Sequence, residues 1–171
     1  MERRNFEVKQ KGRTLYGYAA LFNSKTNLGE FAEVIMPGAF TRTLSALSAA
    51  NIRAIYEHDS KSLLGKVGSK TLRLSEDDKG LAFELDLPDT GLGRDLAELV
   101  KRGDISGCSF GFLPVADTWQ DGEVPIRELR DVDLFEITLT SQPAYADTSV
   151  QLRANAPRSI RLARLYLEAC K

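Results

Sequence analysis

Short runs rich in β-branched and aromatic residues recur along most of the chain, and they limit its possible folds more than any other feature. Clusters of Gly, Asn, Asp and Lys, such as KGR, EDDKG and QDGE, separate them and favour turns. The runs predicted as strands are FEVKQ, TLYGYAALF, IRAIYEH, KTLRLSE, GLAFELDLP, ISGCSFGFLPV, VPIRELRDV and LFEITLTS. So many short strands in 171 residues predict a barrel or a sandwich.

Helices are expected in segments 39–50, 89–103 and 158–171. The middle segment has Asp89 or Thr90 as its N-cap, apolar leucines on one face and Gly103 past its end. The last segment is amphipathic, with arginines on one side, and follows the linker-like NAPRS. We therefore expect one domain over residues 1–153, and a C-terminal helix over 154–171 that serves for packing, oligomerisation or docking.

Composition excludes several classes of function. The net charge is −1 and the basic residues are scattered along the chain, so no basic patch that would bind nucleic acid is expected. No stretch approaches the roughly 20 apolar residues that span a bilayer, so no membrane partner is expected. With only two cysteines and one histidine, neither a disulfide framework nor a metal site of usual spacing is expected, and no cofactor is predicted.

Three polar residues on separate predicted strands form a set suited to acyl transfer. His58, the only histidine, ends IRAIYEH; Ser109 lies in the glycine-flanked ISGCSFGF; and Glu136 alternates with apolar neighbours in FEITLT. Serine, histidine and a carboxylate together make a hydroxyl nucleophilic at neutral pH. Each residue also has a plainer interpretation, as a small packed serine, a structural histidine or a surface carboxylate.

Two alternatives bear on this set. Cys108 is intrinsically the better nucleophile, but strand alternation directs Cys108 and Ser109 to opposite faces, so only one can meet His58. If the strand around His58 is regular, its neighbours Glu57 and Asp59 face away from it and are poor candidates for the orienting acid.

Four segments together resemble the caudovirus prohead serine proteases, which are similar to the herpesvirus assemblins. They are EVIMPGAF (33–40), YEHDSKSLLGKV (56–67), LPDTGLGRDLAELVKRGDISGCSFGF (87–112) and FEITLTSQPAYADTSV (135–150). Their order and spacing carry the resemblance, which covers roughly residues 5 to 152. The resemblance implies a β-rich α+β fold, a closed and mainly antiparallel barrel flanked by helices.

The resemblance also implies a function. It indicates a serine endopeptidase of capsid maturation, made in the host cytoplasm and active inside the prohead, that cleaves a scaffold or capsid-protein extension and itself. It assigns Ser109 as nucleophile, His58 as base and Glu136 as acid, with Asp133 and Asp131 as alternatives for the acid.

The expected partners are the major capsid protein or scaffold as substrate, and a second copy of the chain in a dimer or higher oligomer. By the same resemblance, residues 142–147, and Pro143, Ala144 and Tyr145 in particular, are expected to form the oxyanion or substrate loop. The alternative is a catalytically inactive capsid-assembly or scaffold-associated protein of the same fold.

Overall fold

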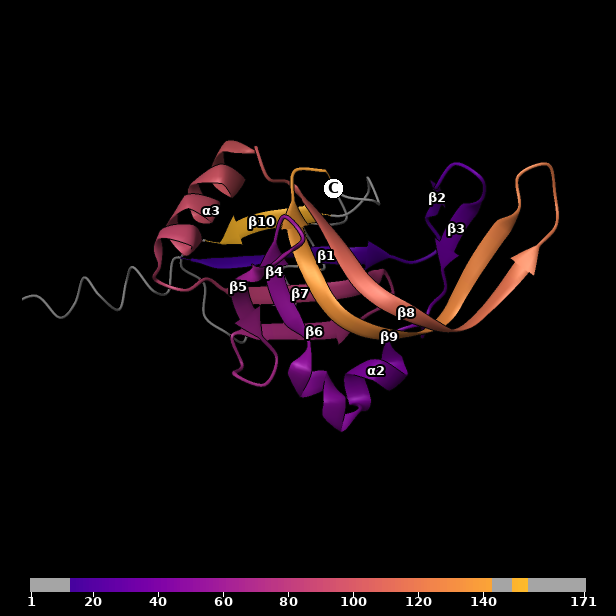
Figure 1. Ribbon diagram of the computed structural model, residues 1–171, viewed down its shortest axis with the longest axis horizontal. Helices are drawn as coiled ribbons and strands as arrows, with labels where there is room; N and C mark the ends of the chain where they lie inside the picture. The colour runs from indigo at the N-terminus through magenta and orange to yellow at the C-terminus, as the bar shows by residue number, and fades with distance from the viewer. Residues whose placement is uncertain (1–12, 143–148, 154–171) are drawn as a thin grey trace, which may run out of the picture.

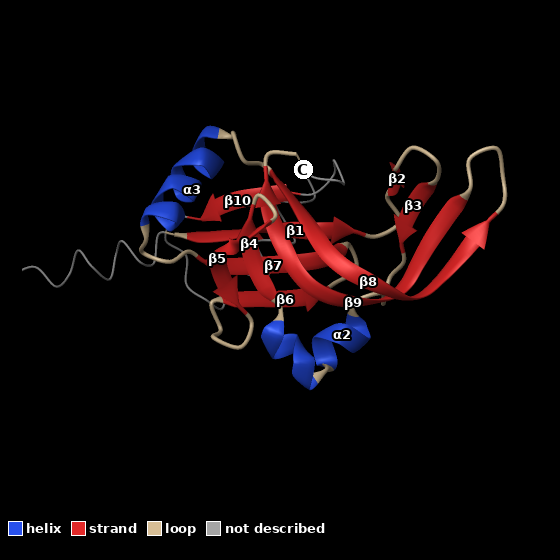
Figure 2. Cartoon of the chain, viewed as in Figure 1, coloured by secondary structure: helices blue, strands red, loops and turns tan. Residues whose placement is uncertain are grey.

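The computed structural model describes residues 13–142 and 149–153, whose strands form two sheets (Figures 1 and 2). The first sheet is antiparallel throughout. Its strands, in spatial order, are β10 (Ser149–Arg153), β1 (Thr14–Leu21), β7 (Gly80–Asp86) and β6 (Leu72–Glu76). Strand β1 is therefore internal, in agreement with its almost complete burial.

The second sheet is organised around one long strand, β9 (Ile126–Thr140). In order, its strands are β2 (Lys25–Asn27), β3 (Ala32–Ile35), β9, β4 (Arg53–Tyr56) and β5 (Asp59–Lys66). Strand β8 (Gly107–Gln120) runs antiparallel along β9 for nearly its whole length. On the opposite edge β9 pairs in parallel first with β3 and then with β4.

The expected β-rich α+β fold is confirmed, but among the described strands neither sheet closes into a barrel. Most pairings are antiparallel, as predicted, whereas the β3–β9 and β4–β9 pairs are parallel. The runs VPIRELRDV and LFEITLTS, predicted as two strands, are one continuous strand, because no turn-forming residues interrupt them. FEVKQ lies outside the described residues.

The predicted helix at 39–50 is broken into α2 (Thr41–Ser45) and the 3₁₀ helix η1 (Leu47–Asn51), with the extended residue Ala46 between them. Helix α3 (Gly91–Arg102) was predicted correctly. The Thr90 side chain accepts a hydrogen bond from Gly93 N, and Gly103 ends the helix in the left-handed conformation. Segment 158–171 lies outside the described residues.

Apolar residues from both sheets and both helices form one core. Phe40, at the start of α2, is fully buried and packs edge-on against Phe110 of β8, with ring centroids 5.6 Å apart. The core side of β8 and β9 also includes Cys108, Ile137 and Leu139. This packing determines which side chains of those strands face away from the core.

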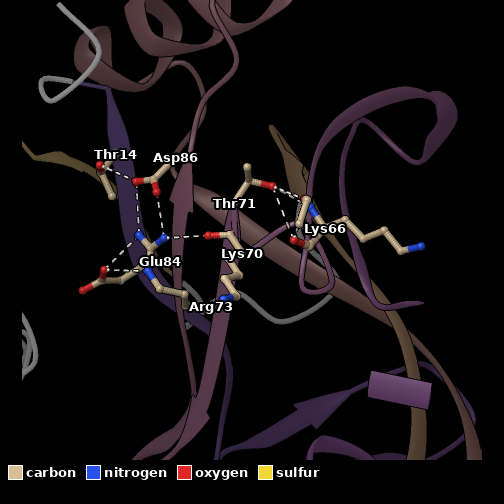
Figure 3. A network of polar contacts seen from close by, with 8 residues as sticks. Thr14, Lys66, Lys70, Thr71, Arg73, Glu84 and Asp86 are labelled. Atoms are coloured by element: carbon tan, nitrogen blue, oxygen red, sulfur yellow. Dashed lines mark hydrogen bonds and ion pairs between the residues drawn. The ribbon is translucent and has the colours of Figure 1, made fainter. Parts of the chain in front are cut away.

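The first sheet carries a polar network on β6 and β7 (Figure 3). Arg73 contacts Glu84 at 3.1 Å and Asp86 at 2.7 Å, and Asp86 accepts a hydrogen bond from the Thr14 hydroxyl of β1. Because Arg73 and Glu84 are cross-strand partners, the network supports the register of this sheet.

Candidate active site

Three strands of the second sheet present a common face away from the core. Cys108 and Phe110 of β8 are core residues, so strand alternation directs Ser109 and Gly111 to the other side. The residues of this outer face align in two adjacent rows across β8, β9 and β4: Ser109, Thr138 and Ile55 in one, and Gly111, Glu136 and Arg53 in the next. The two rows bring Ser109 and Glu136 together as diagonal neighbours.

Ser109 lies in a closely packed part of this face. Its side chain is 2% exposed, and its cross-strand partner Thr138 is fully buried. The Thr138 hydroxyl has no hydrogen-bond partner among the described residues, which is unusual for a buried polar group. The glycines at 107 and 111 keep the strand bare on both sides of Ser109.

Cys108 belongs to the core. It is fully buried, and burial raises the pKa of its thiol well above the usual value. A buried, protonated thiol is a poor nucleophile because the thiolate is the reactive form. The separation of Cys108 and Ser109 onto opposite faces, predicted from alternation, is therefore confirmed.

His58 does not lie in a strand, contrary to the sequence prediction. Strand β4 ends at Tyr56, which pairs with Asp59, so Glu57 and His58 form the two-residue turn of the β4–β5 hairpin. Both residues have positive φ angles, 47° and 58°. Turns of this type usually contain Asn-Gly, so the Glu-His pair gave no turn signal in the sequence. The segment that follows the turn, Asp59–Lys66, is strand β5.

Glu136 forms an ion pair with Arg53, its neighbour across the β9–β4 ladder, at 3.3 Å. It also lies close to Gly111, where a Cβ atom would come within 2.8 Å of its Cγ. The alternative acids are engaged elsewhere: Asp131 and Asp133 both bind Arg42 of α2, at 2.7 and 2.6 Å.

His58 is separate from the other two residues. Its turn follows Ile55 in the direction away from the Glu136 row, roughly 7–10 Å along the sheet and two strands across from Ser109. Within the described part of the chain, no hydrogen bond or ion pair joins His58 to Ser109 or Glu136. The structure thus brings Ser109 and Glu136 together on adjacent strands and places His58 at the same end of the sheet, bonded to neither.

One residue that sequence analysis set aside has close contacts here. Glu57 accepts hydrogen bonds from the Thr140 hydroxyl at 2.8 Å and from Ser141 N at 2.9 Å. It was set aside on the assumption of a regular strand, and the turn invalidates that assumption. No local sequence signal could have shown this contact, because Glu57 and Thr140 are 83 residues apart.

A cavity of about 450 Å³ opens beside the Glu136 row. It lies beside the part of β9 between the residues that pair with β3 and those that pair with β4. No strand covers β9 there, and α2 and η1 line the cavity instead. Arg53 forms part of its wall, together with Ser48, Asn51 and Phe135. Phe135 is 49% exposed, because the register shifts between Leu134 and Glu136 and interrupts the strand alternation there.

Pro143, Ala144 and Tyr145, predicted for the oxyanion or substrate loop, lie outside the described residues. Among residues 13–142 and 149–153 there is no group of three or more His, Cys, Asp or Glu side chains that could hold a metal ion. No helix of that part of the chain is long and apolar enough to cross a membrane.

The fold is similar to that of a herpesvirus protease. The chain is similar to the protease of the herpesvirus KSHV, solved in complex with a hexapeptide phosphonate inhibitor, with a TM-score of 0.53 and 12% identity over 92% of this chain and 77% of that one. The model of the caudovirus prohead serine protease family matches residues 1–161, and the chain belongs to this family. It is a serine protease of phage capsid maturation. No curated protein sequence matches it.

Proposed function

We propose that this protease cleaves a scaffold or capsid-protein extension, and its own chain, inside the prohead, with Ser109 as nucleophile, His58 as general base and Glu136 as the orienting acid. The observation that carries the proposal is the placement of Ser109, on a glycine-flanked strand, diagonally opposite Glu136 on the face away from the core. Family membership supplies the reaction class.

The chemistry follows from the residue types. His58 takes the proton of the Ser109 hydroxyl as the oxygen attacks a peptide carbonyl, and an acyl-enzyme forms when the proton passes to the leaving amine. Water then hydrolyses the acyl-enzyme by the same steps. A carboxylate beside the imidazole fixes its tautomer and stabilises the imidazolium.

This reaction requires a rearrangement of the described site. Ser109 is 2% exposed, Glu136 is paired with Arg53, and His58 lies in an exposed turn. Catalytic hydrogen bonds are often long before substrate binds and shorten in the complex. We therefore propose that peptide binding uncovers Ser109 and brings the His58 turn toward it.

The test is co-expression of the chain with the capsid and scaffold genes of its phage, followed by mass spectrometry of the assembled particles. Wild-type protein should yield processed capsid or scaffold chains and a shortened protease, and Ser109→Ala should yield neither. Ser106→Ala removes an exposed serine three residues earlier and should leave processing intact. Intact precursors in the wild-type particles would instead favour an inactive assembly protein of this fold.

A further inference from the structure

The turn that carries His58 has an unfavourable backbone. Glu57 and His58 both adopt positive φ angles, 47° and 58°, and neither is a glycine. Non-glycine residues in this conformation are strained and persist only where surrounding contacts hold them. Contacts with the surrounding structure must therefore hold this turn.

Glu57 supplies those contacts through its backbone and through both oxygens of its carboxylate. Its backbone N–H donates to Leu139 O at 3.0 Å. Its Oε2 accepts from the Thr140 hydroxyl at 2.8 Å, and its Oε1 accepts from Ser141 N at 2.9 Å. The Thr140 oxygen in turn accepts from Gln142 N at 3.1 Å. The turn is thus attached to the end of β9 at three points.

The Glu57 carboxylate is charged in this setting. Partial burial alone would raise its pKa, but the hydrogen bonds from Ser141 and Thr140 and the nearby His58 lower the pKa below the usual value. A charged acceptor makes the hydrogen bonds that it receives stronger than those between neutral groups.

The attachment point lies close to the nucleophile. Thr140 is the cross-strand partner of Gly107, two residues before Ser109, whereas Thr138 is the partner of Ser109 itself. Glu57 therefore attaches the His58 turn to Thr140, which lies on the same face of β9 as Thr138 and two residues further along the strand. Asp59, on the other side of His58, accepts hydrogen bonds from Lys61 N and the Ser62 hydroxyl, and among the described residues it bonds only within its own hairpin.

We propose that Glu57 is a positioning residue for the general base: it attaches the His58 turn to the end of β9, the strand that pairs with the Ser109 strand, and so sets the position from which peptide binding brings the imidazole to Ser109. The proposal rests on the function proposed above. It assigns the reacting atoms to His58 and Ser109, and gives Glu57 a role only through the turn.

The test compares Glu57→Ala with Asp59→Ala, which removes an equally placed carboxylate that does not reach β9. Glu57→Ala should lower kcat by about 10- to 100-fold, the cost of misplacing a catalytic group by about 1 Å, and change KM less than about twofold. Glu57→Gln keeps the shape of the side chain and one hydrogen-bond acceptor, so its kcat should be at least about fivefold higher than that of Glu57→Ala. Asp59→Ala should stay within about threefold of wild type.

A second measurement needs no substrate. Because His58 is the only histidine in the chain, its imidazole gives an unobscured NMR signal in untagged protein. In Glu57→Ala this signal should move toward the value in the unfolded chain, with the other resonances unchanged, and in Asp59→Ala it should move less.

Two results would overturn the proposal. One is an equal loss of kcat in Glu57→Ala and Asp59→Ala, and the other is a kcat at or above that of wild type in Glu57→Ala. Ser109→Ala separates this failure from that of the proposed function. If Ser109→Ala remains active, the assignment of the nucleophile is wrong, whereas an inactive Ser109→Ala with a fully active Glu57→Ala removes only the role of Glu57.

Discussion

The Glu136–Arg53 ion pair offers a sharp test of the third member of the catalytic set, because two substitutions remove the same pair with different expected effects on activity. Both side chains are partly exposed, 20% for Glu136 and 39% for Arg53, and they are joined by a single contact of 3.3 Å. Such a pair contributes about 0–1 kcal/mol. Either Glu136→Gln or Arg53→Gln should therefore lower Tm by at most about 4 °C.

Activity should separate the two substitutions. If Glu136 orients the imidazole, Glu136→Gln stabilises the wrong tautomer and should reduce kcat by about 10³- to 10⁴-fold, near the loss known for such a change in another triad. Arg53→Gln should stay within about threefold of wild type, because Arg53 has no part in proton transfer. The assay is steady-state cleavage of a peptide that spans a mapped processing site, at equal concentrations of folded enzyme.

A Glu136→Gln enzyme that keeps more than about a third of the wild-type rate would refute the acid role of Glu136, whatever its stability. Asp133→Asn and Asp131→Asn belong in the same series, since both were sequence alternatives. Each binds Arg42 in the structure, so each substitution should affect activity much less than Glu136→Gln. A large loss confined to one of them would move the acid to that position.

Three further predictions follow from the same geometry. Cys108→Ala should lower the free energy of unfolding by about 1–2 kcal/mol, since it empties part of the core, yet keep activity within about threefold; loss of activity in a folded Cys108→Ala protein, with Ser109→Ala active, would reverse the assignment of the nucleophile. Gly111→Ala should lower the free energy of unfolding by about 1–3 kcal/mol and displace Glu136, because the Glu136 Cγ lies 2.8 Å from the added Cβ. Gly122→Ala has its nearest atom at 3.6 Å from the added Cβ and should lower the free energy of unfolding by less than about 0.5 kcal/mol, as measured by urea unfolding. The pKa of Glu57 is lower in the folded chain than the ordinary pKa of a glutamate, so its charge stabilises the fold above that ordinary pKa. The stability difference between wild type and Glu57→Gln should be present at pH 7 and shrink as the pH falls below about 4.3, the ordinary glutamate value, and a difference that grows on acidification would contradict this sign.

The expected self-association depends on segment 158–171, which lies outside the described residues. It stays a prediction from the amphipathic pattern and the resemblance. Sedimentation of Ser109→Ala protein over a concentration series, beside a version ending at Arg153, is the measurement that decides it.

Local pattern was sufficient wherever a structural choice depended on neighbouring residues. The leucines of segment 89–103, with Thr90 before them and Gly103 after them, determine α3 and both its ends, because helix periodicity and capping act within one or two turns. Alternation along β8 likewise separated Cys108 from Ser109, since successive side chains of a strand face opposite sides.

Tertiary structure decided what depends on residues far apart in the chain. The β9 strand is shared between β3 and β4, the register shift exposes Phe135, and His58 lies in a turn that Glu57 attaches to Thr140. Cross-strand register and ion-pair partners depend on which strands meet, and a period of two is the same for every strand. The sequence alone therefore indicated which residue types carry out the chemistry, and the pairing of the strands determined how far apart they lie.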